Sequence, residues 1–190
     1  MFIRVKKVKK RNGNVYEYAH LVHGIWKRKR LKELEGKRFF KRFNNSVHNY
    51  KRFLGRVYRF ENLKEKDFEG FLGESFGEFV EKNNVKEIYR KLLEYELVCC
   101  GFRNKKGVYF RDNIFVDLNR LVVHDGKSDV VVKLKDFSGY LCSLNLDELF
   151  KIQRINGRHE GVYFLKKLRM AGISLNAEQV YTLVEKMLKL

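Results

Sequence analysis

The pattern of hydrophobic and polar residues predicts a β-hairpin at the start of the chain. Residues 2–9 and 15–22 are rich in strand-favouring residues and flank Asn12-Gly13, a dipeptide typical of tight hairpin turns. A two-residue turn there pairs Arg11 with Asn14. One face of the hairpin then mixes bases with aromatic rings, because it carries Ile3, Val5, Lys7, Lys9, Tyr16, Tyr18, His20 and Val22. The other face is apolar towards its open end, so the pattern leaves open which face packs.

The following segment is expected to complete a small basic module. Ile25 and Trp26 begin a third strand that runs into the basic residues 27–30. Residues 44–46 offer N-caps to a helix, whose apolar positions at helical spacing are Val47, Tyr50, Leu54 and Val57. A second face of this helix carries three arginines, Arg52, Arg56 and Arg59. Such a stripe suits a phosphate backbone, since neighbouring like charges disfavour a helix unless an anion relieves them.

The residues after position 60 predict a mixed α and β body. Short helices at 67–71 and 74–81 and a longer one at 85–95 precede strands at 97–102 and 108–110. Helices followed by a hairpin with a basic tip are typical of a winged helix-turn-helix, here over residues 61–112. Its wing would carry three bases, Arg103, Lys105 and Lys106.

The rest of the body predicts a second small sheet and three more helices. Strands are expected at 114–116, 121–123 and 130–134, with 140–144 as a further candidate. Helices are expected at 146–155 and 162–171, and Asn176 with Gln179 forms a capping box for a final helix. We therefore predict an α+β protein with two modules, residues 1–60 and 61–190.

The distribution of charge along the chain indicates a class of function. Residues 1–60 contain 19 Lys and Arg but three acids, so they hold +16 of the formal net charge of +18. A basic cluster with interleaved aromatics is typical of nucleic-acid binding. The candidate binding residues are Lys7, Lys9, Tyr16, Tyr18, Trp26, Lys27, Arg28, Lys29, Arg30, Lys41, Arg42, Arg52, Arg56 and Arg59. For each aromatic residue, a place in the core of a small sheet is an equal alternative.

Other function classes find little support in the sequence. Cys99, Cys100 and Cys142 form no CxxC pair, which indicates buried free thiols. We find no phosphate loop, GxGxxG motif or nucleophile elbow, so no cofactor or metal is expected and a binding protein is favoured over an enzyme. Acidic residues scattered between strands leave a metal-dependent nuclease or recombinase as an alternative.

Localisation and source follow from the same sequence. It has no signal-peptide core after Met1 and no apolar run of bilayer length, so we expect a cytoplasmic protein without a membrane partner. A composition rich in Lys and Glu, with two glutamines, favours a thermophilic source.

The first 36 residues resemble the leader segment of DDE-type insertion-sequence transposases. The resemblance rests on MFIRVKKVKK at 1–10, YEYAHLV at 16–22 and RKRLKELEG at 28–36, and it implies a DNA-associated module. The chain is too short for the catalytic domain of that family, so transposase activity is not implied. The whole chain is also similar to small orphan proteins of archaeal plasmids and viruses.

These observations predict a DNA-binding protein of a mobile genetic element. The basic module would supply affinity, and the body would supply specificity or homodimerisation. An RNA-binding protein is the alternative, since a basic aromatic sheet also suits single-stranded RNA.

Overall fold

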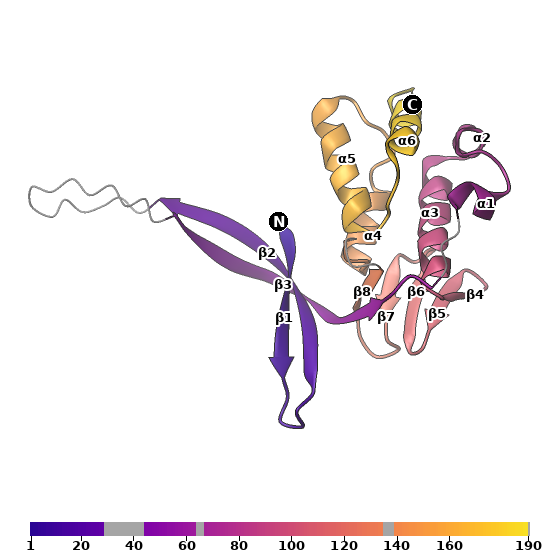
Figure 1. Cartoon of the computed structure of the whole chain (residues 1–190). Helices are drawn as coiled ribbons and strands as arrows, with labels where there is room; N and C mark the ends of the chain where they lie inside the picture. The colour runs from indigo at the N-terminus through magenta and orange to yellow at the C-terminus, as the bar shows by residue number, and fades with distance from the viewer. Residues whose placement is uncertain (29–43, 64–66, 135–138, 190) are drawn as a thin grey trace, which may run out of the picture. The chain divides into compact units, whose positions relative to one another are not determined.

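The computed structural model describes residues 1–28, 44–63, 67–134 and 139–189, and the side chains of 25–28 and 44–48 are not described. Two compact units are present, Met1–Leu54 and Gly55–Leu190, called here the N-terminal and C-terminal units. Helices and two sheets occur together, as Figure 1 shows, which confirms the predicted α+β class.

The N-terminal unit is built from three strands, in the order β1-β2-β3. These are β1 (Phe2–Lys9), β2 (Val15–Arg28) and β3 (Asn44–Phe60), and the last residues of β3 belong to the C-terminal unit. The predicted hairpin is present. The expected third strand at Ile25 and Trp26 is wrong, because both residues continue β2 without a break.

The register of the hairpin differs from the prediction by one residue. Phe2 pairs with Val22 and Lys9 pairs with Val15, which leaves the three-residue loop 11–13 after a Lys10–Asn14 pair. Gly13 takes the left-handed conformation at φ 83°, the usual geometry after a type I turn in such loops. The longer loop moves every side chain of β2 to the other face relative to β1.

The helix expected over residues 47–57 is wrong, because this segment is strand β3. Its apolar residues are aromatic or β-branched at most positions, and these residue types favour strands over helices. Gly55 adopts φ +115°, and a Cβ there would lie 2.1 Å from the carbonyl oxygen of Asp129. The helical stripe of Arg52, Arg56 and Arg59 therefore does not form.

The C-terminal unit contains an antiparallel sheet of four strands, in the order β4-β5-β6-β7. These are β4 (Arg103–Lys105), β5 (Val108–Arg111), β6 (Ile114–Asp117) and β7 (Val122–His124). The next strand, β8 (Val131–Leu134), was expected in one small sheet with β6 and β7. It instead runs parallel to the end of β3, with Val57 opposite Val131 and Phe60 opposite Leu134.

Six helices accompany these strands in the described residues, and most lie close to their predicted places. They are α1 (Phe68–Leu72), α2 (Phe76–Lys82), α3 (Val85–Cys99), α4 (Ser143–Phe150), α5 (Arg158–Met170) and α6 (Ala177–Lys189). The Asn176–Gln179 capping box is confirmed by its two reciprocal hydrogen bonds. The strand predicted at 97–102 is wrong, because α3 continues to Cys99. Gly101, with φ 78°, stops the helix from continuing further.

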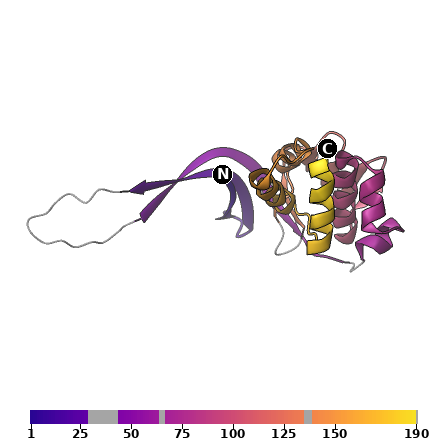
Figure 2. The ribbon, with the colours of Figure 1, turned by 90° about the horizontal axis from the view of Figure 1, so that it is seen from above.

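The core of the C-terminal unit lies between its helices and strands. Figure 1 shows helices α3–α6 on one side of strands β4–β7, and in Figure 2 helix α6 lies between α5 and α3. Tyr89 of α3 is fully buried between the rings of Phe150 and Phe164, and its hydroxyl donates to the carbonyl of Ile152 at 2.7 Å. Burial raises the pKa of Tyr89, so its hydroxyl stays protonated and available as a donor.

The cysteines and helices bear on two other expectations. All three cysteines are buried thiols outside any disulfide bond, as predicted. Every helix in the described part of the chain is too short or too polar to cross a bilayer.

Candidate nucleic-acid interface

Exposed bases dominate the described surface of the N-terminal unit. All eight Lys and Arg of this unit whose side chains are described are exposed, whereas its one described acid, Glu17, is partly buried. Glu17 lies 3.8 Å from Lys7, a contact too exposed to cancel much charge. The eight bases are Arg4, Lys6, Lys7, Lys9, Lys10, Arg11, Lys51 and Arg52. The described surface of this unit is therefore strongly positive.

One face of the β1–β2 hairpin combines bases with aromatic rings. Arg4 lies opposite His20, Lys6 opposite Tyr18 and Val8 opposite Tyr16, and residues paired in this way project from the same face. The three rings are half-buried. This face thus combines bases with aromatic rings, but its basic members are Arg4 and Lys6 and not the predicted Lys7 and Lys9.

Strand β3 adds two exposed rings to this face. His20 contacts Tyr50 and Phe53, each at 5.3 Å between ring centroids, and Tyr18 lies 6.1 Å from Phe53. Tyr50 is 39% exposed and Phe53 is 58% exposed, so both rings present surface to a partner. We call this surface the aromatic face; its members are Arg4, Lys6, Lys10, Tyr16, Tyr18, His20, Tyr50 and Phe53.

Two lysines lie over the rings of the aromatic face. Lys6 Nζ is 4.1 Å from the centroid of Tyr50, and Lys10 Nζ is 5.8 Å from that of Tyr18. Cation–π attraction holds each ammonium group near a ring without neutralising it. Positive charge and flat apolar surface therefore occur side by side, the combination that phosphates and bases contact together.

The same charges act on the histidine at the centre of this face. Partial burial, and then the positive charge of Lys6, lower the pKa of His20 below its ordinary value of 6.5. The imidazole of His20 is consequently neutral at neutral pH, and a negative charge bound beside it would favour its protonation.

The structure separates candidate residues that the sequence had grouped. Tyr16 and Tyr18 lie on the aromatic face, but Lys7 pairs with Glu17 and Lys9 with Val15 on the opposite face. The shared face predicted for Lys7, Lys9, Tyr16 and Tyr18 is wrong, because the hairpin loop has three residues and not two.

The remaining N-terminal candidates are only partly described. Trp26, Lys27 and Arg28 belong to β2, but their side chains lie outside the described part of the chain. Lys29, Arg30, Lys41 and Arg42 lie outside it entirely.

The three arginines of the expected helical stripe are exposed on β3. Arg52 belongs to the N-terminal unit, whereas Arg56 and Arg59 belong to the C-terminal unit. Arg56 lies over the ring of Tyr58 at 4.8 Å, and Arg59 lies opposite Lys133 on β8.

The described residues do not confirm the winged helix-turn-helix expected over 61–112. Arg103 and Lys105 on β4 and Lys106 in the β4–β5 turn are exposed, as a wing would require. However, β5 continues into β6 and β7, and the candidate recognition helix α3 is buried along half of its circumference. Its outer side carries acids as well as bases, including a Lys91–Glu94 ion pair at 3.1 Å.

Sequence reasoning missed six members of the aromatic face: Arg4, Lys6, Lys10, His20, Tyr50 and Phe53. The wrong hairpin register hid Arg4, Lys6 and Lys10, and the predicted helix hid Tyr50 and Phe53. A strand prediction for β3 was available from the aromatic and β-branched residues of this segment.

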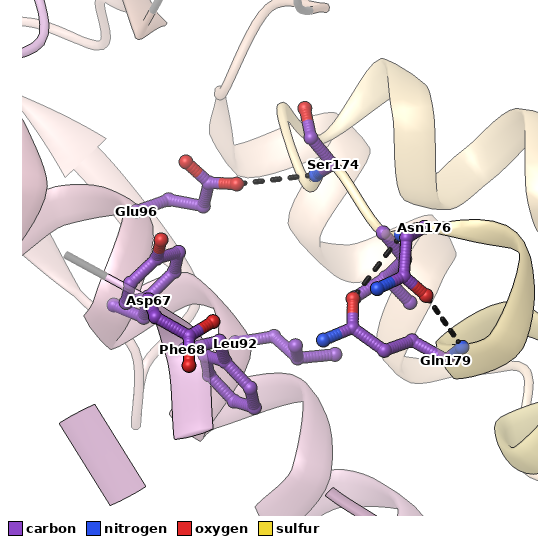
Figure 3. Close-up of a pocket in the computed structure, with 9 residues that line it drawn as sticks. Asp67, Phe68, Leu92, Glu96, Ser174, Asn176 and Gln179 are labelled. Carbon is purple, nitrogen blue, oxygen red and sulfur yellow. Dashed lines mark hydrogen bonds between the residues drawn. The ribbon is translucent and has the colours of Figure 1, made fainter. Parts of the chain in front are cut away.

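A pocket of about 230 Å³ in the C-terminal unit offers a second site to consider (Figure 3). Its lining residues are Asp67, Phe68, Leu92, Tyr95, Glu96, Ser174, Leu175, Asn176 and Gln179. The buried carboxylate of Glu96 accepts from the backbone N–H of Ser174 at 3.1 Å, and Asn176 and Gln179 bond to each other. Glu96 therefore joins α3 to the segment before α6, and Asn176 with Gln179 caps α6, so these polar groups have structural roles.

Metal-dependent chemistry has no assembled site in the described residues. No group of three or more His, Cys, Asp or Glu side chains among them is arranged to hold a metal ion.

Comparisons with protein-family models, with curated proteins and with solved structures find no match to this chain.

Proposed function

We propose that this protein binds nucleic acid through the aromatic face of its N-terminal unit, with duplex DNA as the partner. The observation that carries the proposal is the concentration of +16 of the +18 formal charge in residues 1–60. Contacts between Lys or Arg and phosphates release condensed counterions, and this release drives association with a nucleic acid. A role in a mobile genetic element accords with the transposase-like leader sequence.

The arrangement of bases on the aromatic face supports this proposal. Arg4, Lys6 and Lys10 are exposed, and the two lysines are held near rings. Ordered side chains lose less conformational freedom when they bind a phosphate. The rings of Tyr50 and Phe53 would then pack against sugars or bases beside the contacted phosphates.

Replacement of Arg4, Lys6 and Lys10 by glutamine tests the proposal in the full chain. Each lost phosphate contact lowers the slope of log K against log salt by about 0.9, so three lost contacts lower it by up to about 2.7. At 100 mM salt the affinity for a labelled duplex should fall by up to about 500-fold. Fluorescence anisotropy over a salt series measures both quantities.

A matched control is available in the C-terminal unit. Lys82, Lys151 and Lys189 are exposed and lie beside carboxylates, so glutamine at these positions removes the same total charge. We expect the control variant to keep the wild-type salt slope. Equal slopes for both variants would mean that the aromatic face makes no phosphate contacts, and the proposal would fail.

Binding to single-stranded RNA is a second candidate, and the exposed ring of Phe53 favours it. An unpaired base can stack on such a ring, whereas bases inside a duplex are already stacked. Competition between duplex DNA, single-stranded DNA and RNA at one salt concentration separates the candidates. Under the RNA alternative, Phe53→Ala weakens single-strand binding selectively; under the duplex proposal, duplex DNA competes best.

A further inference from the structure

Helix α5 presents a second surface that the N-terminal unit does not explain. The C-terminal unit contains 24 bases and 20 acids, a net charge of +4. Residues 153–170, which comprise α5 and the segment before it, contain five bases and one acid, so this short stretch also has a net charge of +4. The positive charge of the unit is therefore concentrated at α5.

The exposed residues of α5, apart from Glu160, form one continuous face. At 100° per residue they fall within an arc of about 140°, and the buried residues Phe164 and Leu168 lie on the other side. The exposed face of α5 consists of Arg158, His159, Val162, Tyr163, Lys166 and Arg169. It contains three Lys or Arg side chains and one histidine, and no carboxylate.

The nearby acids are engaged away from this face. Glu160 accepts from the backbone N–H of Asn156 at 2.8 Å and from its side-chain amide at 3.1 Å. Glu148 of α4 binds the buried ammonium group of Lys167. The bases on the exposed face of α5 therefore keep their charge for an external anion.

Apolar surface lies at the centre of the same face. Val162 is 62% exposed and Tyr163 is 48% exposed, between Arg158 at one end and Lys166 and Arg169 at the other. Arg158 and Arg169 are separated by about 17 Å along the helix axis, at 1.5 Å per residue. A helix of this kind fits the major groove, where its ends can reach phosphates and its middle can contact base edges and thymine methyl groups.

The start of α5 has a further feature in keeping with an anionic partner. Arg158 occupies the first turn, where the helix dipole disfavours positive charge, and Gly157 supplies no side-chain cap to the first N–H groups. A phosphate near this end would interact favourably with both the guanidinium group and the free ends of the helix amides.

From these observations we infer that α5 is a second DNA contact, which enters the major groove with Val162 and Tyr163 towards the bases and Arg158, Lys166 and Arg169 towards the phosphates. The inference shares its partner with the proposed function but uses a different surface, so either can fail alone. It assigns sequence reading to the C-terminal unit and general affinity to the N-terminal unit.

Two variants of the full chain test this inference. In the first, glutamine replaces Arg158, Lys166 and Arg169, which are exposed and therefore dispensable for folding; circular dichroism checks that the fold is retained. Loss of three phosphate contacts lowers the salt slope by up to about 2.7. Between 50 and 200 mM salt, the wild-type affinity for a random-sequence duplex should then fall up to about 40-fold more than that of the variant.

In the second variant, alanine replaces Val162 and Tyr163. Selection from a randomised duplex pool should enrich a sequence motif with the wild type and a weaker or different motif with this variant, at an unchanged salt slope. An unchanged slope in the first variant, or the same motif from the second variant and the wild type, would overturn the inference.

The N-terminal variant of Arg4, Lys6 and Lys10 separates this inference from the proposed function. If only the N-terminal variant loses salt dependence, the proposed function stands and the α5 contact is wrong. If only the α5 variant loses it, DNA binding belongs to α5 and the aromatic face is not the interface. Loss in both supports the two contacts together.

Discussion

At the scale of single residues, His20 links the aromatic face to pH. Its pKa lies below 6.5 in the free protein because of partial burial and Lys6. A bound phosphate favours the protonated imidazole and also offsets the charge of Lys6, so the pKa rises on binding. The complex therefore holds more protons than the free protein, and affinity should increase as the pH falls.

This pH dependence is measurable in a single variant. Between about pH 8 and about pH 5.5, the affinity of the wild type for duplex DNA should rise more steeply with falling pH than that of His20→Gln. The two slopes of log K against pH should differ by at most about one, because His20 takes up at most one proton on binding. His23→Gln, which changes an exposed histidine of the same strand, serves as the control. Parallel pH profiles for all three proteins would contradict a phosphate beside His20.

In the absence of DNA, a fall in pH is unfavourable, because it lowers the stability of the folded protein. The unfolded chain, with the ordinary histidine pKa of 6.5, binds protons more readily than the folded protein. Protonation of His20 therefore favours unfolding. The free energy of unfolding should decrease as the pH falls through 6.5.

Gly55 is the residue on which the backbone of β3 depends most directly. A Cβ at this position would meet the carbonyl oxygen of Asp129 at 2.1 Å, and the φ of +115° is itself unfavourable for other residues. Gly55→Ala should lower the free energy of unfolding by about 3 kcal/mol or more. Urea denaturation of the purified variant measures this change.

Gly73→Ala separates the two causes of that loss. Gly73 has φ +79°, but a Cβ added there would have no atom within 4 Å beyond its own chain neighbours. Its substitution therefore costs only the backbone strain, about 1 kcal/mol. Similar losses at the two positions would show that the approach of Asp129 to Gly55 is not tight.

At the scale of elements, the hairpin loop decides which side chains share a face. Gly13 holds the left-handed position of the three-residue loop without close neighbours. Gly13→Ala should weaken the hairpin by about 1 kcal/mol, and Gly13→Asn by less, since Asn tolerates this conformation. Hydrogen exchange of the β1 and β2 amides reports the difference. Equal protection in both variants would argue against the left-handed loop.

The sequence was sufficient for elements defined by strong local signals. The hairpin, α1 to α3, the strands β5 to β8 and the capping box of α6 depend on turn residues and caps within a few positions. Prediction from the sequence failed where the spacing of apolar residues was compatible with either a helix or a strand. Val47, Tyr50, Leu54 and Val57 fit a helical face by number, but their residue types and the conformation of Gly55 favour a strand.

The sequence predicted the residue types of the candidate site better than their arrangement on the sheet. Tyr16 and Tyr18 were recognised, but one extra loop residue placed Val8 and Lys6 opposite them in place of Lys9 and Lys7. Pairing partners from a distant strand, such as Tyr50 and Phe53, depend on tertiary contacts that local patterns do not specify.

The exposed face of α5 was missed for a related reason. The predicted helix began at residue 162 and so excluded Arg158 and His159, which form the first turn of α5. Without these residues the remaining pattern does not combine bases at both ends with an apolar centre.

At the scale of the whole molecule, two positive surfaces belong to two different units. The aromatic face lies in residues 1–54 and the exposed face of α5 in residues 158–169. A chain that contacts one duplex through both would combine general affinity with sequence reading. Its total salt slope would then exceed the slope that either surface gives alone.

Lysine footprinting tests the central claim most directly. Acetylation of the full chain with and without duplex DNA, followed by mass spectrometry, reports the protection of each lysine. We predict that DNA protects Lys6 and Lys10 on the aromatic face more than Lys7 and Lys9 on the opposite face, while Lys82 and Lys151 stay unprotected. Equal modification of Lys6 and Lys10 with and without DNA would contradict binding through the aromatic face.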